Sequence, residues 1–167
     1  MILLVNDAGI LIDLLKIDLI EPFFQLENEF YITDFVRAEI HEINAGHLDT
    51  FIQYGKLIKK TFSFDELGQI QRLEVKHRAL SIPDCSCLYL AELLSATLLT
   101  GDGALRRIAK QNNIPVHGIL WIFDELVRHD LISTKTAYEK LKKIMSINPR
   151  LPIDECNKRL IKWKKGR

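Results

Sequence analysis

The chain opens with MILLVNDAGILIDLL at residues 1–15, in which an apolar run stops at two polar residues, Asn6 and Asp7. A continuous apolar run of this length is typical of a strand that is buried on both faces, as strands of a parallel sheet are. Beyond it, apolar residues recur at helical spacing over 10–19. We therefore expect a buried strand over residues 1–6 that is followed directly by a helix.

The alternation of strand-like and helix-like segments continues along the chain. Strands that alternate with helices indicate βαβ units and a parallel sheet. We therefore expect an α/β fold of three layers, in which a short, mostly parallel sheet is flanked by helices. The further strands expected are 29–33, 96–100 and 114–117, and the further helices are 34–43, 47–60, one ending near 78, 82–94, 104–111 and several from 120 onward, with breaks near 133 and 148–152.

Two helix starts carry specific signals. Thr33 is placed to cap a helix whose apolar positions are Val36, Ile40 and Ile43. The segment SIPD at 81–84 combines a capping serine, a proline in the first turn and an aspartate three residues after the serine. Both patterns predict helices that begin at these residues.

The charge of the chain is nearly balanced, with 23 basic and 22 acidic residues and a net charge of +1. This balance gives no overall nucleic-acid signature. The charged residues are unevenly distributed along the chain, because residues 135–167 contain eleven Lys and Arg but only three acids. This segment is either a solvated helical tail or an arm that contacts phosphate or an acidic partner.

The three cysteines cannot form a disulfide framework, and they lack zinc-like Cys-x-x-Cys spacing. Cys85 and Cys87 lie in a very apolar stretch, so we expect them to be buried free thiols, and reduced thiols suit the cytosol. The apolar N-terminus is interrupted by Asn6, Asp7 and Asp13 and has no basic segment before it, so we expect neither a signal peptide nor a membrane span. The expected location is cytoplasmic.

Two acidic residues directly follow expected strands. Asp7 follows the first apolar run, and Asp102 follows the strand over 96–100. Sites in parallel α/β folds form at the carboxyl ends of the strands, so both are candidates for chemistry. Taken singly, each could instead form a turn or cap the next helix.

Two further acids are candidates. Glu39 lies at the edge of the apolar stripe of its helix, where a carboxylate is costly unless it is paired or binds a metal, and a salt bridge is the alternative. Asp84 could simply cap its helix. If these acids converged with Asp7 and Asp102, they would repel one another and require a divalent cation. Ligands that are all carboxylates favour Mg²⁺ or Mn²⁺ over Zn²⁺.

The same four acids, in this order, resemble the PIN domain. Asp7 follows the N-terminal strand, and the other three lie in YITDFVRAEIHE, IPDCSCLYLAE and LLTGD, followed by the helix ALRRIAKQNNIPVHG. The resemblance covers about residues 1–130. Within the family, the chain is similar to the toxin-like bacterial and archaeal members related to VapC-type ribonucleases.

The resemblance implies a PIN-like nuclease domain over 1–130, and we expect residues 131–167 to be a basic helical extension packed on it. It also implies a metal-dependent endoribonuclease that hydrolyses RNA phosphodiester bonds, as the toxin of a toxin–antitoxin pair, and a homodimer with a cognate antitoxin as partner. The implied catalytic and metal-binding residues, for Mg²⁺ or Mn²⁺, are Asp7, Glu39, Asp84 and Asp102, with Thr100 as a supporting polar residue.

Two other functions remain open. The chain could be a catalytically inactive PIN-like module that binds RNA or protein, with its acids serving as caps and salt bridges. A phosphohydrolase on another doubly wound fold is less favoured, because Gly9 stands where an Asp-x-Asp motif needs its second acid. We expect Trp121 and Phe123 to be core or dimer-contact residues rather than a surface that stacks RNA bases.

Overall fold

The computed structural model describes residues 1–41 and 45–166. Within this part of the chain, one sheet has the strand order β3-β2-β1-β4-β5, and every pair of neighbours is parallel. The expected α/β fold with a parallel sheet flanked by helices is therefore confirmed. The strands are β1 (Leu3–Asn6), β2 (Glu29–Thr33), β3 (Leu57–Lys60), β4 (Thr97–Leu99) and β5 (Val116–His117).

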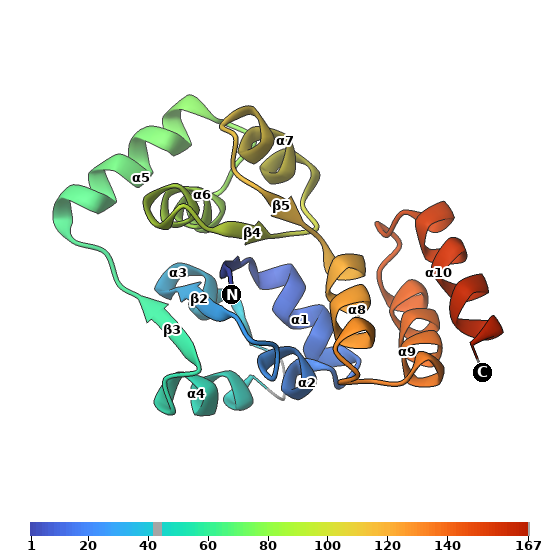
Figure 1. Ribbon diagram of the computed structural model, residues 1–167. Coiled ribbons are helices and arrows are strands. Elements are labelled where there is room, and N and C mark those ends of the chain that lie inside the picture. The colour runs from blue at the N-terminus through green and yellow to red at the C-terminus, as the bar shows by residue number, and fades with distance from the viewer. Residues whose placement is uncertain (42–44, 167) are drawn as a thin grey trace.

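Helices cover both faces of the sheet. In the described residues they are α1 (Ala8–Lys16), α2 (Ile20–Phe24), α3 (Asp34–Glu39), α4 (Gly46–Gln53), α5 (Phe64–Lys76), α6 (Ile82–Leu94), α7 (Gly103–Gln111), α8 (Ile119–Arg128), α9 (Thr134–Ile147) and α10 (Ile153–Lys165). Figure 1 shows α5, α6 and α7 on one side of the sheet, and α1, α2 and α8 on the other. The result is the expected three-layer arrangement.

The central strand β1 and its neighbour β4 have their carboxyl ends at the same level in the sheet. Asn6 in β1 is paired with Leu99 in β4, and the backbone N–H of Asp7 donates to the carbonyl oxygen of Leu99 at 3.0 Å. Leu4, Val5 and Leu99 are fully buried, because helices pack on both faces. The residues that follow β1 and β4 therefore lie side by side at one edge of the sheet.

Both predicted helix starts are confirmed. The hydroxyl of Thr33 accepts a hydrogen bond from the N–H of Val36 at 3.1 Å at the start of α3. Ser81 and Asp84 form a reciprocal capping box at the start of α6, in which each side chain accepts from the other residue's backbone N–H. Such caps satisfy N–H groups that have no partner inside the helix.

The expected helix over residues 47–60 is wrong in its second half. The helix α4 ends at Gln53, and the chain turns at Gly55, whose φ of +73° a glycine adopts without strain. Leu57–Lys60 then forms β3 at the edge of the sheet, where β2 is its one partner strand among the described residues. Only Leu57 of this strand is buried. The strand therefore lacks a long apolar run, and its two lysines resemble the basic last turn of a helix.

The expected helix through Ile43 is also too long. The helix α3 ends at Glu39, and Ile40 is extended, with φ −92° and ψ 108°, although its side chain stays buried. The guanidinium of Arg37 donates to the carbonyl oxygen of Ile40 at 2.9 Å and also binds Asp49, which holds the chain in this turn. Ile43 lies outside the described residues.

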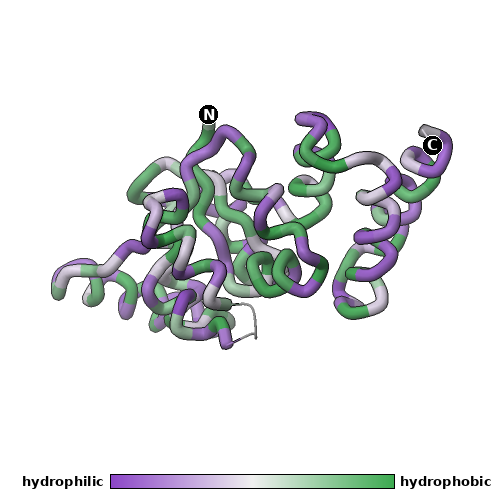
Figure 2. The backbone as a smooth tube through the Cα atoms, turned by 90° about the horizontal axis from the view of Figure 1, so that it is seen from below, coloured by the Kyte–Doolittle hydropathy of each residue, from purple (hydrophilic) through white to green (hydrophobic). Residues whose placement is uncertain are grey.

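The last two helices, α9 and α10, pack on each other beside α8, at one end of the molecule in Figure 2. Trp163 of α10 is buried, with its ring centroid 5.9 Å from that of Phe123 in α8. Arg159 of α10 also forms an ion pair with Asp124 of α8, at 2.6 Å. Apolar and ionic contacts thus fix the pair of helices against the body of the protein.

All three cysteines are buried and free, which confirms the prediction for Cys85 and Cys87. Phe123 belongs to the core, which confirms that prediction too. In the described residues, no helix combines the length and the apolar character that a bilayer crossing requires.

Candidate active site

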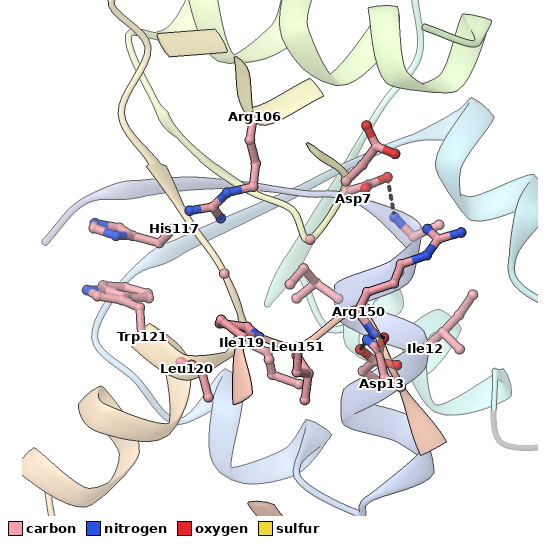
Figure 3. Close-up of a pocket in the computed structure, with 18 of the residues that line it drawn as sticks. Asp7, Ile12, Asp13, Arg106, His117, Ile119, Leu120, Trp121, Arg150 and Leu151 are labelled. Carbon is pink, nitrogen blue, oxygen red and sulfur yellow. Dashed lines mark hydrogen bonds between the residues drawn. The ribbon is translucent and has the colours of Figure 1, made fainter. Parts of the chain in front are cut away.

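A cavity of about 730 Å³ lies at the edge of the sheet where β1, β4 and β5 end (Figure 3). Its walls include the residues after these strands, the last residue of α3, the first turn of α6 and the segment that joins α9 to α10. All four acids expected from the sequence line it: Asp7, Glu39, Asp84 and Asp102.

Asp7 is the most enclosed of the four acids, with 8% of its surface exposed. One carboxylate oxygen accepts from the N–H of Ala8 at 2.7 Å, and the other accepts from the hydroxyl of Thr100 at 2.7 Å. Burial, together with the smaller effects of the charges of Asp84 and Glu39, raises the pKa of Asp7 to about 6, against the lowering effect of the two hydrogen bonds. The Asp7 charge is thus the least well solvated in the cavity.

Asp84 and Asp102 combine a capping role with a place in the cavity. Asp84 accepts from the N–H of Ser81 at 2.9 Å, within the capping box of α6. Asp102 caps α7 by accepting from the N–H of Leu105 at 2.8 Å, and its own N–H donates to the Thr100 hydroxyl at 3.1 Å. The capping interpretation of these two acids is therefore correct, and it does not remove them from the cavity.

Glu39 differs from expectation in its burial. It was expected at a buried margin, but it is the last residue of the short helix α3 and its side chain is exposed. Partial loss of solvent, and then the charge of Asp84, raise its pKa. In the described part of the chain, none of the four acids forms an ion pair, so the salt-bridge interpretation of Glu39 has no support there.

The chemistry of the four acids suits a divalent cation, although their present arrangement does not enclose one. Among the described residues, no three His, Cys, Asp or Glu side chains are grouped so that they could hold a metal ion. Asp84 and Asp102 each use one carboxylate oxygen to accept a hydrogen bond in a helix cap. Burial is the main cause of the raised pKa of Asp7 and Glu39, and the repulsion between acids that adds to it is what a bound cation would relieve. Ligation through water, or rotation of a capping carboxylate, would complete such a site.

Two buried hydroxyl groups, those of Thr33 and Ser86, meet beside the turn that carries Asp84, and the sequence indicated only the capping role of Thr33. The hydroxyls of Thr33 and Ser86 are hydrogen-bonded at 2.8 Å, and Ser86 also donates to the Pro83 carbonyl oxygen at 2.7 Å. The Thr33–Ser86 bond joins the end of β2 to α6, and the Ser86–Pro83 bond extends this link to the first turn of α6. Together they help to position the turn that carries Asp84. In a single sequence, hydroxyls inside apolar segments give no signal for such a contact.

Sequence reasoning also missed the cationic residues of the cavity. Arg106, on α7, donates from its guanidinium to the carbonyl oxygen of Thr100 at 2.9 Å. Arg150, in the segment between α9 and α10, is exposed and also lines the cavity. The two arginines stand 44 positions apart in the sequence, so only the fold shows that they share a site with the acids.

A comparison with protein-family models gives a match over residues 3–165 to the model described as PIN domain. The match spans nearly the whole chain, and the protein therefore belongs to the PIN-domain family. Domains of this family are usually nucleases, which generally use divalent metals such as Mg²⁺. A search of curated proteins found no match to this chain.

Replacing Thr100 by Val is expected to raise the pKa of Asp7 further. The substitution removes the hydroxyl that donates to the Asp7 carboxylate, and a hydrogen bond to a charged group contributes roughly 1.5–3 kcal/mol. NMR titration of the Asp7 carboxyl carbon in metal-free protein should show a rise of about one pKa unit. Thr97→Val, at the start of the strand β4 that Thr100 directly follows, is the matched control, and an equal shift in both variants would contradict the assignment.

Proposed function

We propose that this protein is a metal-dependent endoribonuclease that hydrolyses RNA phosphodiester bonds. The observation that carries the proposal is the convergence of four carboxylates, without ion-pair partners in the described residues, on one cavity at the carboxyl edge of a parallel sheet in a PIN-domain chain. The proposed catalytic and metal-binding residues are Asp7, Glu39, Asp84 and Asp102.

Each proposed residue has a role that follows from its environment. Asp7 supplies the most enclosed negative charge, and Thr100 holds its carboxylate in place. Asp84 and Asp102 are fixed by their own helix caps, and Glu39 completes the acidic rim from α3. A Mg²⁺ or Mn²⁺ ion held by these oxygens would polarise the phosphodiester and lower the pKa of an attacking water.

A second candidate is a catalytically inactive PIN-like module that binds RNA or protein. It is favoured by the capping roles of Asp84 and Asp102, and by the lack, among residues 1–41 and 45–166, of three side chains grouped to hold an ion. Under this alternative, the acids would stabilise helices and the cavity would serve only for binding.

Circular single-stranded RNA distinguishes these candidates and also tests for internal cleavage. With Mn²⁺, the protein is expected to open the circles, because an endonuclease needs no free end. Asp102→Asn should remove the cleavage but keep the helix cap, since Asn caps as well as Asp. Glu92→Gln, an exposed change on the same helix as Asp84, is the control and should cleave like the wild type. Intact circles with folded, inhibitor-free protein would favour the binding module.

We further propose a cytoplasmic toxin that is neutralised by an antitoxin protein and that forms a homodimer. The dimer is supported by exposed apolar side chains, Phe64 and Val75 on α5 and Leu93 on α6. Expression of the wild-type chain alone in bacteria should arrest growth, whereas expression of Asp102→Asn at an equal level should not. Equal growth in both strains would contradict the toxin role, and a monomer in light scattering would contradict the dimer.

A further inference from the structure

The cavity continues beyond the acids to a pair of stacked aromatic rings. His117, at the end of β5, and Trp121, in the first turn of α8, have ring centroids 4.6 Å apart and planes inclined by only 4°. Both are half-buried and both line the cavity (Figure 3). Trp121 is thus not wholly a core residue, and part of its surface faces the space that the acids also face.

A cation connects the aromatic pair to the acids. Arg106 donates to the carbonyl oxygen of Thr100, the residue whose hydroxyl donates to Asp7. The charge of Arg106 also lowers the pKa of His117, after the larger effect of burial, so these two side chains are close neighbours. In Figure 3, Arg106 is drawn between Asp7 and the rings of His117 and Trp121. Acid, cation and aromatic surface therefore follow one another along a single cavity.

The size and lining of the cavity match a nucleotide. A volume of about 730 Å³ is typical of a site for an organic ligand, and it exceeds what two cations and one phosphate group would fill. The aromatic pair is accompanied by apolar side chains, Ile119, Leu120 and Leu151. A nucleobase is flat and apolar on its faces, whereas its phosphate is anionic and suits a guanidinium.

We propose that this part of the cavity binds one nucleotide of a single-stranded RNA next to the bond that is cut. Its base packs against Trp121 and His117, and its phosphate is bound by Arg106. This inference rests on the proposed ribonuclease function and deepens it, since it assigns the substrate as unpaired RNA with a base turned out of the stack. Paired RNA would be a poor substrate, because its bases are not available for stacking on protein side chains.

Binding can be measured without cleavage, because the chain has only two tryptophans and Trp163 is buried. A short single-stranded 2′-O-methyl RNA, added to the Asp7→Asn protein in EDTA, is expected to quench the fluorescence of Trp121. Trp121→Phe in the same background should lose the quenching and leave the Trp163 signal unchanged. Quenching that persists in Trp121→Phe would overturn the proposal, and so would binding seen by anisotropy without any quenching.

Cleavage kinetics supply a second readout. Stacking of a base on an aromatic side chain contributes roughly 1–3 kcal/mol, so Trp121→Ala should lower kcat/KM for single-stranded RNA by about 10- to 100-fold. Trp121→Phe should recover part of the loss, because it keeps an aromatic ring. Tyr54→Ala, which removes an exposed aromatic ring from the end of α4, is the control and should change little.

The failures of the two proposals are distinguishable. RNA cleavage that is equal in wild type and in folded Trp121→Ala overturns the nucleotide site and leaves the nuclease intact. Quenching of Trp121 by RNA, in a protein that cuts no RNA, supports the nucleotide site and overturns the nuclease. A duplex RNA of the same sequence that quenches Trp121 equally well would overturn the assignment to unpaired RNA.

Discussion

Asp7→Asn is expected to lower the rate of RNA cleavage by at least about three orders of magnitude, which corresponds to roughly 4 kcal/mol of lost transition-state stabilisation. Asn has nearly the shape of Asp but lacks the negative charge that would bind the cation. Asp7 should show the largest effect of the four acids, because it is the most buried and the charges of both Asp84 and Glu39 act on it.

The prediction is tested by single-turnover cleavage with wild type, Asp7→Asn and the exposed control Glu92→Gln, in saturating Mn²⁺. Circular dichroism should show the same fold in all three. A loss in Asp7→Asn of less than tenfold would mean that the Asp7 carboxylate does not bind the metal that supports cleavage.

The second large effect concerns stability. In metal-free protein at pH 8, Asp7→Asn is expected to raise the free energy of unfolding by about 2–3 kcal/mol. The pKa of Asp7 is about 6 in the fold, against a reference value of 3.8, and one unit corresponds to about 1.4 kcal/mol. The wild-type protein therefore carries a buried, poorly solvated charge above pH 6, which the neutral amide avoids. Loss of one of the two hydrogen bonds to Asp7 will reduce this gain.

The sign of the pH dependence follows from proton counting. Between pH 3.8 and about 6 the folded state binds more protons at Asp7 than the unfolded state does, so this residue makes stability fall as pH rises through that window. Below pH 3.8 both states are protonated and the penalty is absent. Urea unfolding in EDTA should thus show a clearly larger gain in stability from Asp7→Asn at pH 8 than at pH 4. A difference that is equal at both pH values would contradict the raised pKa.

Much of the fold could be predicted because its signals are local. The apolar run before Asp7 and the polar stop after it define β1 within a few residues, and SIPD at 81–84 contains every group of its own capping box. The edge strand Leu57–Lys60 could not be recognised, because its residues pair with residues of β2 that lie 27 positions earlier and only one of its side chains is buried.

For the candidate site, too, one part could be predicted from the sequence and the other could not. The acids could be selected from the sequence, because Asp7 and Asp102 directly follow buried strands and parallel strands bring such residues to one edge. The positions of Arg106, Arg150 and Trp121 in the same cavity depend on how α7, α8 and the α9–α10 connection pack. Such long-range packing leaves no mark in a single sequence.

The measurement that tests the central claim most directly is the metal dependence of RNA cleavage by the wild-type protein. Purified protein, with any bound inhibitor removed and its fold confirmed, is incubated with single-stranded RNA in Mn²⁺, in EDTA, and in EDTA followed by excess Mn²⁺. The account predicts cleavage in Mn²⁺, none in EDTA, and recovery when Mn²⁺ is restored. Cleavage that continues in EDTA, or RNA that stays intact under all three conditions, would contradict it.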